Sequence, residues 1–109
     1  MIGSARYRTH TCLGAAGEDG ARVRVAGWVH RRRDHGGLVF VDLRDRSGLL
    51  QLVFHPEDAP AAHALAHELR AEDVVSATGR VVARAPETVN ERIPTGRVEL
   101  RVEAVERLA

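Results

Sequence analysis

The segment LVFVDLRDRSGLLQLVF, residues 38–54, holds two runs of alternating residues around a short polar sequence at residues 45–48. Alternation with a period of two is typical of a β-strand with one buried face. The polar residues between the runs are Asp, Arg, Ser and Gly, which favour a tight turn. The segment therefore predicts two adjacent antiparallel strands, and their register decides which face is buried.

A two-residue turn at Arg46 and Ser47 would fix that register. It places apolar residues opposite one another in three pairs: Leu43 with Leu50, Val41 with Leu52, and Val39 with Phe54. All six are expected to be buried, and a slip of one residue would destroy the match. The outer face then carries Phe40, with Gln51 as its diagonal neighbour on the second strand. An aromatic ring on that face needs an explanation.

The sequence before the hairpin predicts one more strand. Residues 22–29 alternate, and Gly27 inside them is expected to mark a bend or a bulge. Residues 33–37 predict a turn into the hairpin. Residues 1–20 are polar and rich in glycine, and we expect them to form a loose N-terminal lead-in segment. The folded domain is expected to span residues 21–109.

The sequence after the hairpin predicts one helix and two strands. Asp58 is expected to cap the helix, with Pro60 in its first turn. The apolar positions at helical spacing, over four turns at most, are Ala62, Leu65, Ala66 and Leu69. Residues 75–83 and 98–104 alternate as strands, joined by a loop. Three strands, a helix and two strands form the order of the OB-fold, an all-β, five-stranded Greek-key barrel that binds ligands on its second and third strands.

The composition limits the classes of protein to consider. The 109 residues suit one domain, and a hydrophobic content of 44% argues against disorder. The net charge is only +1, so a basic function must be local, and residues 31–33 are the one dense arginine cluster. Cys12 is the only cysteine, which excludes a disulfide framework and favours a cytoplasmic protein. No apolar run approaches membrane-spanning length and residues 1–10 do not resemble a signal peptide, so no membrane partner is expected.

Phe40, Gln51 and Arg33 form the candidate binding site. An aromatic ring can stack on an unpaired base, an amide can bond to the edge of that base, and arginines can hold phosphates. The alternative is a half-buried phenylalanine under a loop beside a solvated run of arginines, and alternation alone leaves both open. His63 and His67 have a metal-compatible spacing, but no third ligand is near and the glutamate of the HExxH pattern is missing. We therefore expect no metal site.

Three segments resemble the N-terminal anticodon-binding domain of bacterial aspartyl-tRNA synthetases. They are RTHTC at residues 8–12, GWVHRRRDHGGLVFVDLRDRSGLLQLVF at residues 27–54, and TGRVEL at residues 95–100. The resemblance covers nearly the whole chain from Arg8, and its long central segment is specific. It implies that the barrel binds the anticodon loop of tRNA-Asp. Binding of tRNA-Asn as well is left open, and His35 resembles the members that charge both.

The resemblance also assigns roles by position. Phe40 would stack on the middle base of the anticodon and Gln51 would read its edge, while Glu99 on the last strand would read the first base. Arg84 and Asn90 would contact the third base. The remaining implied RNA contacts are Arg31, Arg32, Arg33 and His35.

The class II catalytic motifs are absent from the 109 residues, so we do not expect this chain alone to be an enzyme. No metal or cofactor is expected in it. A parent aspartate–tRNA ligase would use ATP and Mg²⁺ in its catalytic domain and would be a homodimer, whereas the isolated domain is expected to be a monomer. Two other functions stay open, a general single-strand-binding protein with several exposed aromatic residues and a barrel that binds another protein.

Overall fold

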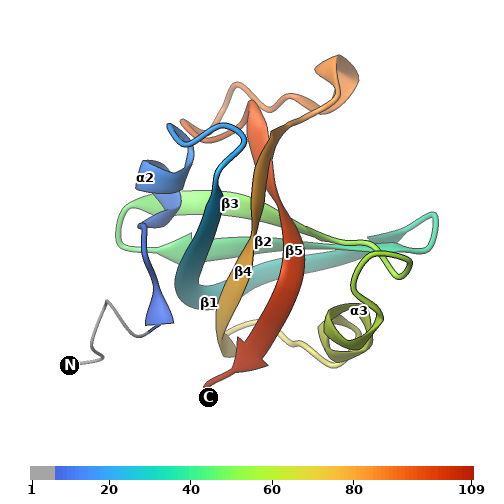
Figure 1. Cartoon of the computed structure of the whole chain (residues 1–109). Coiled ribbons are helices and arrows are strands. Elements are labelled where there is room, and N and C mark those ends of the chain that lie inside the picture. The colour runs from blue at the N-terminus through green and yellow to red at the C-terminus, as the bar shows by residue number, and fades with distance from the viewer. Residues whose placement is uncertain (1–6) are drawn as a thin grey trace.

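A computed structural model describes residues 7–109 and shows a closed barrel with the strand order β1-β2-β3-β5-β4 (Figure 1). The strands are β1 Arg22–His35, β2 Leu38–Asp45, β3 Gly48–Phe54, β4 Val74–Ala83 and β5 Val98–Arg107. The short helical elements of the described residues are α2 Cys12–Ala15, α3 Pro60–Ala66 and η1 Pro86–Thr88. All neighbouring strands are antiparallel except β3 and β5, which run parallel and close the barrel. The strand order and the helix between β3 and β4 confirm the predicted OB-fold.

The register of β2 against β3 is the one that the two-residue turn predicts. Val39 pairs with Phe54, Val41 with Leu52, and Leu43 with Leu50. These six side chains are fully buried in the barrel core. The prediction succeeded because only this register keeps polar side chains out of the core.

Strand β1 is longer than the sequence predicts. Residues 33–35 were expected to be part of a turn, but they pair with residues 38–40 of β2. The turn consists of Gly36 and Gly37 alone, with φ angles of +60° and +84°. Two consecutive residues with positive φ make the tight hairpin turn whose twist matches that of the strands, so the ladder continues up to the glycines.

The irregularity expected at Gly27 lies further along β1. Gly27 is in regular register with Val75, and the bulge falls between Val29 and Arg31. Gly27 is needed for a different reason, since a Cβ atom there would lie 2.2 Å from the carbonyl oxygen of Arg44. The bulge adds one residue to β1, so the side chains that follow it point to the opposite faces from those that the sequence alternation would give. It therefore sets which arginines of β1 face outward.

The lead-in segment is packed rather than loose over the residues that the structure describes, and residues 1–6 lie outside them. In α2, Cys12 and Ala15 are fully buried in the barrel core. The hydroxyl of Thr11 caps the helix by accepting from the Gly14 N–H at 2.9 Å. Burial, followed by the nearby carboxylate of Asp45, raises the pKa of the Cys12 thiol well above its usual range. The cysteine is therefore a core residue without nucleophilic character.

Helix α3 begins at Pro60, as expected, but Asp58 does not cap it. Ala59 occupies the cap position without a side-chain hydrogen bond. The Asp58 carboxylate instead accepts from Arg101 Nε on β5 at 2.7 Å. The prediction was wrong because a guanidinium from a distant strand takes the carboxylate. The helix is about two turns long, and no helix within residues 7–109 is long and apolar enough to cross a membrane.

Asp45 fastens α2 to the β2–β3 turn. Its carboxylate accepts from the Cys12 N–H at 2.8 Å, from the Ser47 N–H at 2.8 Å and from the Ser47 hydroxyl at 2.5 Å. Burial alone would raise the pKa of Asp45, but the bonds from Ser47 and Cys12 outweigh it and hold the pKa below its usual value. The ionised form therefore stabilises the fold.

Asp45→Asn is expected to lower the free energy of unfolding by about 1–3 kcal/mol at neutral pH, because bonds to a charged acceptor are lost. The native pKa is lowered, so this stabilisation is complete above an ordinary aspartate pKa of about 3.9 and disappears as pH falls through the native value. Urea unfolding across this pH range should show that the free energies of unfolding of the wild type and Asp45→Asn become equal in acid. Glu57→Gln, at an exposed carboxylate, should keep the wild-type dependence of stability on pH. The same dependence in Asp45→Asn would contradict the stabilising role of Asp45.

Candidate nucleic-acid interface

A cavity of about 460 Å³ opens on the outer face of β1, β2 and β3, beside the loop between β4 and β5. We call it the outer-face cavity. The predicted site residues that line it are Arg31, Arg33, His35, Phe40, Gln51, Arg84 and Asn90. Its other lining residues are Asp42, Leu49, Thr88 and Ile93. The structure thus brings together residues from three strands and one loop.

Phe40 is half-buried in this cavity and has Arg33 as its cross-strand partner. The Arg33 guanidinium carbon lies 5.4 Å from the centroid of the Phe40 ring, a distance at which a cation and an aromatic face attract. The ring is therefore partly covered by a charged side chain and partly exposed. An unpaired base can stack on the exposed part of such a ring.

Arg33, Gln51 and Glu99 form a hydrogen-bonded chain across β1, β3 and β5. Arg33 Nη2 donates to Gln51 Oε1 at 3.0 Å, and Gln51 Nε2 donates to Glu99 Oε1 at 2.9 Å. Gln51 is only 5% exposed. We call this chain the Arg33–Gln51–Glu99 network. It connects Glu99 to the outer-face cavity, although Glu99 is not one of the residues that line it.

Arg84 is a predicted contact residue whose side chain mainly supports the loop. It is 8% exposed, and it donates to the Val98 carbonyl at 3.0 Å and to the Thr88 carbonyl at 3.2 Å. Burial lowers the pKa of its guanidinium, although the carboxylates of Glu99 and Asp42 oppose the shift. Arg84 therefore holds the loop that carries Asn90 against the barrel.

Arg32 points away from the outer-face cavity. Its guanidinium donates to the carbonyl of His67 and, at 3.4 Å, to that of Ala66, at the end of α3. A cation in this position complements the negative end of the helix. The bulge in β1 explains the separation, because Arg32 pairs with the inward-facing Val41 while Arg31 pairs with the outward-facing Asp42.

The two histidines of α3 have partners of their own. Their rings meet edge to face with centroids 4.6 Å apart, and His63 Nε2 lies 2.8 Å from the Gly37 carbonyl oxygen. His67 Nδ1 lies 3.6 Å from a carboxylate oxygen of Asp34. Among residues 7–109, no group of three or more His, Cys, Asp and Glu side chains could hold a metal ion.

Sequence reasoning missed four of the side chains in the outer-face cavity. Asp42 and Leu49 lie on the same outward face as Phe40, so the alternation could have included them. Thr88 and Ile93 belong to the β4–β5 loop, where no periodic pattern exists. Their position follows from tertiary contacts, including the bond from Arg84 to the Thr88 carbonyl.

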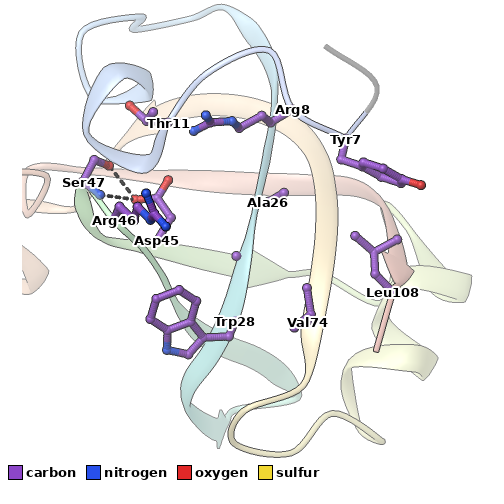
Figure 2. Close-up of a pocket in the computed structure, with 11 residues that line it drawn as sticks. Tyr7, Arg8, Thr11, Ala26, Trp28, Asp45, Arg46, Ser47, Val74 and Leu108 are labelled. Atoms are coloured by element: carbon purple, nitrogen blue, oxygen red, sulfur yellow. Dashed lines mark hydrogen bonds between the residues drawn. The ribbon is translucent and has the colours of Figure 1, made fainter. Parts of the chain in front are cut away.

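A second cavity, of about 610 Å³, shares no lining residue with the first. Figure 2 shows Trp28, Val74 and Leu108 around it, with Asp45 bonded to Ser47 at its edge. The Asp45 carboxylate is already used within the fold. The outer-face cavity, which combines an aromatic ring with the Arg33–Gln51–Glu99 network, is the stronger candidate for a binding site.

Comparison with known proteins identifies the family of the chain. Residues 23–108 match the tRNA anti-codon family, described as an OB-fold nucleic acid binding domain. Aspartate–tRNA(Asp/Asn) ligase of Caulobacter sp. (strain K31) is 57% identical over 105 residues, which are 94% of this chain and 17% of the relative. The ligase of the same name from Parvibaculum lavamentivorans is 59% identical over 90 residues, 83% of this chain and 15% of the relative. The chain thus spans about a sixth of the length of these relatives.

Solved structures share the barrel. Asparaginyl-tRNA synthetase from Pyrococcus horikoshii, complexed with asparaginyl-adenylate, superposes with a TM-score of 0.76 at 29% identity, covering 99% of this chain and 23% of that one. An OBody bound to hen egg-white lysozyme, AM2EP06, has a TM-score of 0.78 at 26% identity and 93% coverage of both chains. The same barrel therefore occurs both in synthetases and in a chain bound to a protein.

Proposed function

Because this chain belongs to the tRNA anti-codon family of OB-fold nucleic acid binding domains, we propose that it is the anticodon-recognition module of a longer aspartate–tRNA ligase. The observation that carries the proposal is the outer-face cavity, where Phe40 and the Arg33–Gln51–Glu99 network lie together. The parent protein would attach aspartate to tRNA-Asp in the cytoplasm, with ATP and Mg²⁺ held by its other domains and with a homodimer as its assembly. The relatives named for both tRNA-Asp and tRNA-Asn favour recognition of both tRNAs.

In this proposal the bases of the anticodon loop leave their stack and enter the cavity. The middle base stacks on the exposed part of the Phe40 ring, while Arg33 keeps its bond to Gln51. Gln51 then bonds to the edge of that base through the donor and acceptor capacity that its amide retains. Asn90, held by the loop that Arg84 supports, is available to a neighbouring base. The domain does this without a metal or cofactor of its own.

The general single-strand binder remains the second candidate, and the cavity lining argues against it. Sequence-tolerant binding uses several aromatic platforms in a row. Phe40 is the single Phe, Tyr or Trp among the described residues that line the outer-face cavity. One platform beside a polar network suits the reading of a particular base.

Binding to hairpin RNAs tests the proposal. One hairpin carries the tRNA-Asp anticodon loop, and a control has the same stem with an unrelated loop sequence. The wild-type domain is expected to bind the anticodon loop more tightly. Equal affinity for the two hairpins would refute anticodon recognition.

Arg31 is expected to contact the RNA backbone. It is exposed, it lines the cavity, and its side chain makes no ion pair or hydrogen bond within residues 7–109. Each phosphate contact on single-stranded RNA contributes about −0.7 to the slope of log affinity against log salt. Arg31→Ala should therefore flatten that slope by about 0.7, measured with the anticodon hairpin over a salt series.

Arg22→Ala is the matched control, because it removes the same charge at the start of β1, where Arg22 pairs with Glu103. That variant should keep the wild-type slope. If both variants change the slope equally, the effect is one of net charge and Arg31 makes no specific phosphate contact.

A further inference from the structure

We propose that Glu99 is a positioning residue that, together with Arg33, locks the Gln51 amide in one orientation and thereby sets which bases Gln51 accepts. The inference rests on the proposed function, because it concerns the base that stacks on Phe40. It differs from a direct role of Glu99 in reading another base. Its evidence is the Arg33–Gln51–Glu99 network.

The chemistry of the two partners allows one orientation of the amide. A guanidinium can only donate hydrogen bonds and a carboxylate can only accept them. Arg33 therefore requires the Gln51 oxygen on its side, at 3.0 Å, and Glu99 requires the Gln51 nitrogen on its side, at 2.9 Å. A flipped amide would place oxygen against carboxylate and N–H against guanidinium. Since Gln51 is 5% exposed, water cannot compensate for that loss.

The locked amide still has capacity for a base. Its oxygen retains one lone pair and its nitrogen retains one N–H. Their order is fixed, with the acceptor on the Arg33 side, beside the Phe40 ring, and the donor on the Glu99 side. A base stacked on Phe40 must therefore present a donor to the oxygen and an acceptor to the nitrogen.

This order separates two classes of base. Uracil and guanine offer a ring N–H next to a carbonyl oxygen, whereas cytosine and adenine offer a ring nitrogen acceptor next to an amino group. Uracil stacked in one pose can donate its ring N–H to the Gln51 oxygen and accept from the Gln51 N–H. Cytosine in the same pose would place its ring nitrogen against the Gln51 oxygen and its amino group against the Gln51 N–H, and both contacts are repulsive. An amide free to rotate would fit either edge. By fixing the Gln51 amide, Arg33 and Glu99 therefore make it selective for uracil and guanine over cytosine and adenine.

Glu99→Gln tests whether Glu99 orients the Gln51 amide, because it removes the charge with little change in side-chain size. The amide of the new side chain can donate or accept, so only Arg33 still fixes the Gln51 amide and the preference for one orientation weakens. Glu103→Gln is the matched control, because Glu103 is on the same strand, does not line the outer-face cavity, and its replacement removes the same charge. Each protein is measured against hairpins that differ only in the middle base and against hairpins that differ only in the first base.

The expected result is that Glu99→Gln reduces the preference for uridine over cytidine at the middle base by about tenfold or more, the scale of one bond to a charged partner. Affinity for the uridine hairpin should change much less. Lost discrimination at the first base, with the middle base unaffected, would overturn the inference and make Glu99 a direct reader.

The RNA-free domain provides an independent measurement. NMR of the Gln51 side-chain NH₂ group should show slower hydrogen exchange for the proton bonded to Glu99 than for its geminal partner, and Glu99→Gln should reduce that difference because the charged acceptor is lost. Equal exchange of the two protons in the wild type would overturn the lock whatever the RNA results. If the lock is present but no hairpin is preferred, the proposed function fails and the positioning role of Glu99 within the network stands.

Discussion

Phe54→Ala is expected to lower the free energy of unfolding by about 3–5 kcal/mol, the usual cost of truncating a buried phenylalanine. Phe54 is fully buried, and it closes the core where β3 pairs with Val39 of β2. Removing the ring leaves a cavity that a closed barrel can fill only by distorting its strands. Domains of this size are stable by about 5–15 kcal/mol, so the variant should lie close to its unfolding threshold.

Urea denaturation measures this loss, and Phe40→Ala is its matched control. Both variants remove the same ring from the same hairpin, but Phe40 is half-buried on the outer face. The control should therefore lose much less stability than Phe54→Ala. Equal losses would mean that the two rings do not differ in burial as the structure shows.

Phe40→Ala is expected to weaken binding of the anticodon hairpin by about 1–3 kcal/mol, or about 5- to 150-fold in Kd. The loss comes from the stacking platform, and every base has a face that can stack. It should therefore be of similar size whichever base occupies the middle position. Gln51→Ala should behave in the opposite way, with a larger effect on base preference than on overall affinity.

Phe40→Leu separates stacking from simple apolar contact. Leucine keeps apolar volume on the outer face but has no aromatic face for a base or for Arg33. Its affinity for the hairpin is expected to fall nearly as far as that of Phe40→Ala. A leucine variant with wild-type affinity would show that the ring does not stack on a base.

The hairpin of β2 and β3 could be predicted because its own residues determine it. The turn at Arg46 and Ser47 and the burial of Val41 and Leu52 all require one register, which the structure confirms. The site residues on this hairpin were placed correctly on the outer face for the same reason. Two strands that are adjacent in sequence and share a buried face can pair in few registers.

A bulge was expected in β1, but its position could not be predicted, because it depends on how β1 pairs with β2 and with β4. Its position reverses the alternation after Val29. It therefore sends Arg31 and Arg33 to the cavity and Arg32 to the end of α3. In the sequence the three arginines look equivalent.

The Arg33–Gln51–Glu99 network also escaped sequence analysis. Its last bond depends on the parallel contact of β3 with β5, which pairs Leu52 with Leu100. Alternation shows which residues of a strand face outward but not which distant strand lies beside it. The packing of α2 was hidden for another reason, since two small residues, Cys12 and Ala15, supply its buried face.

The most direct test of the account is the affinity of the wild-type domain for four anticodon hairpins that differ only in the middle base. The account predicts that the uridine hairpin binds most tightly, because a ring on the outer face and a locked amide act on the same base. It also predicts that Gln51→Ala narrows the differences among the four while Phe40→Ala lowers all four together. Equal affinity of the wild-type domain for all four hairpins would contradict base reading and would indicate a general single-strand binder.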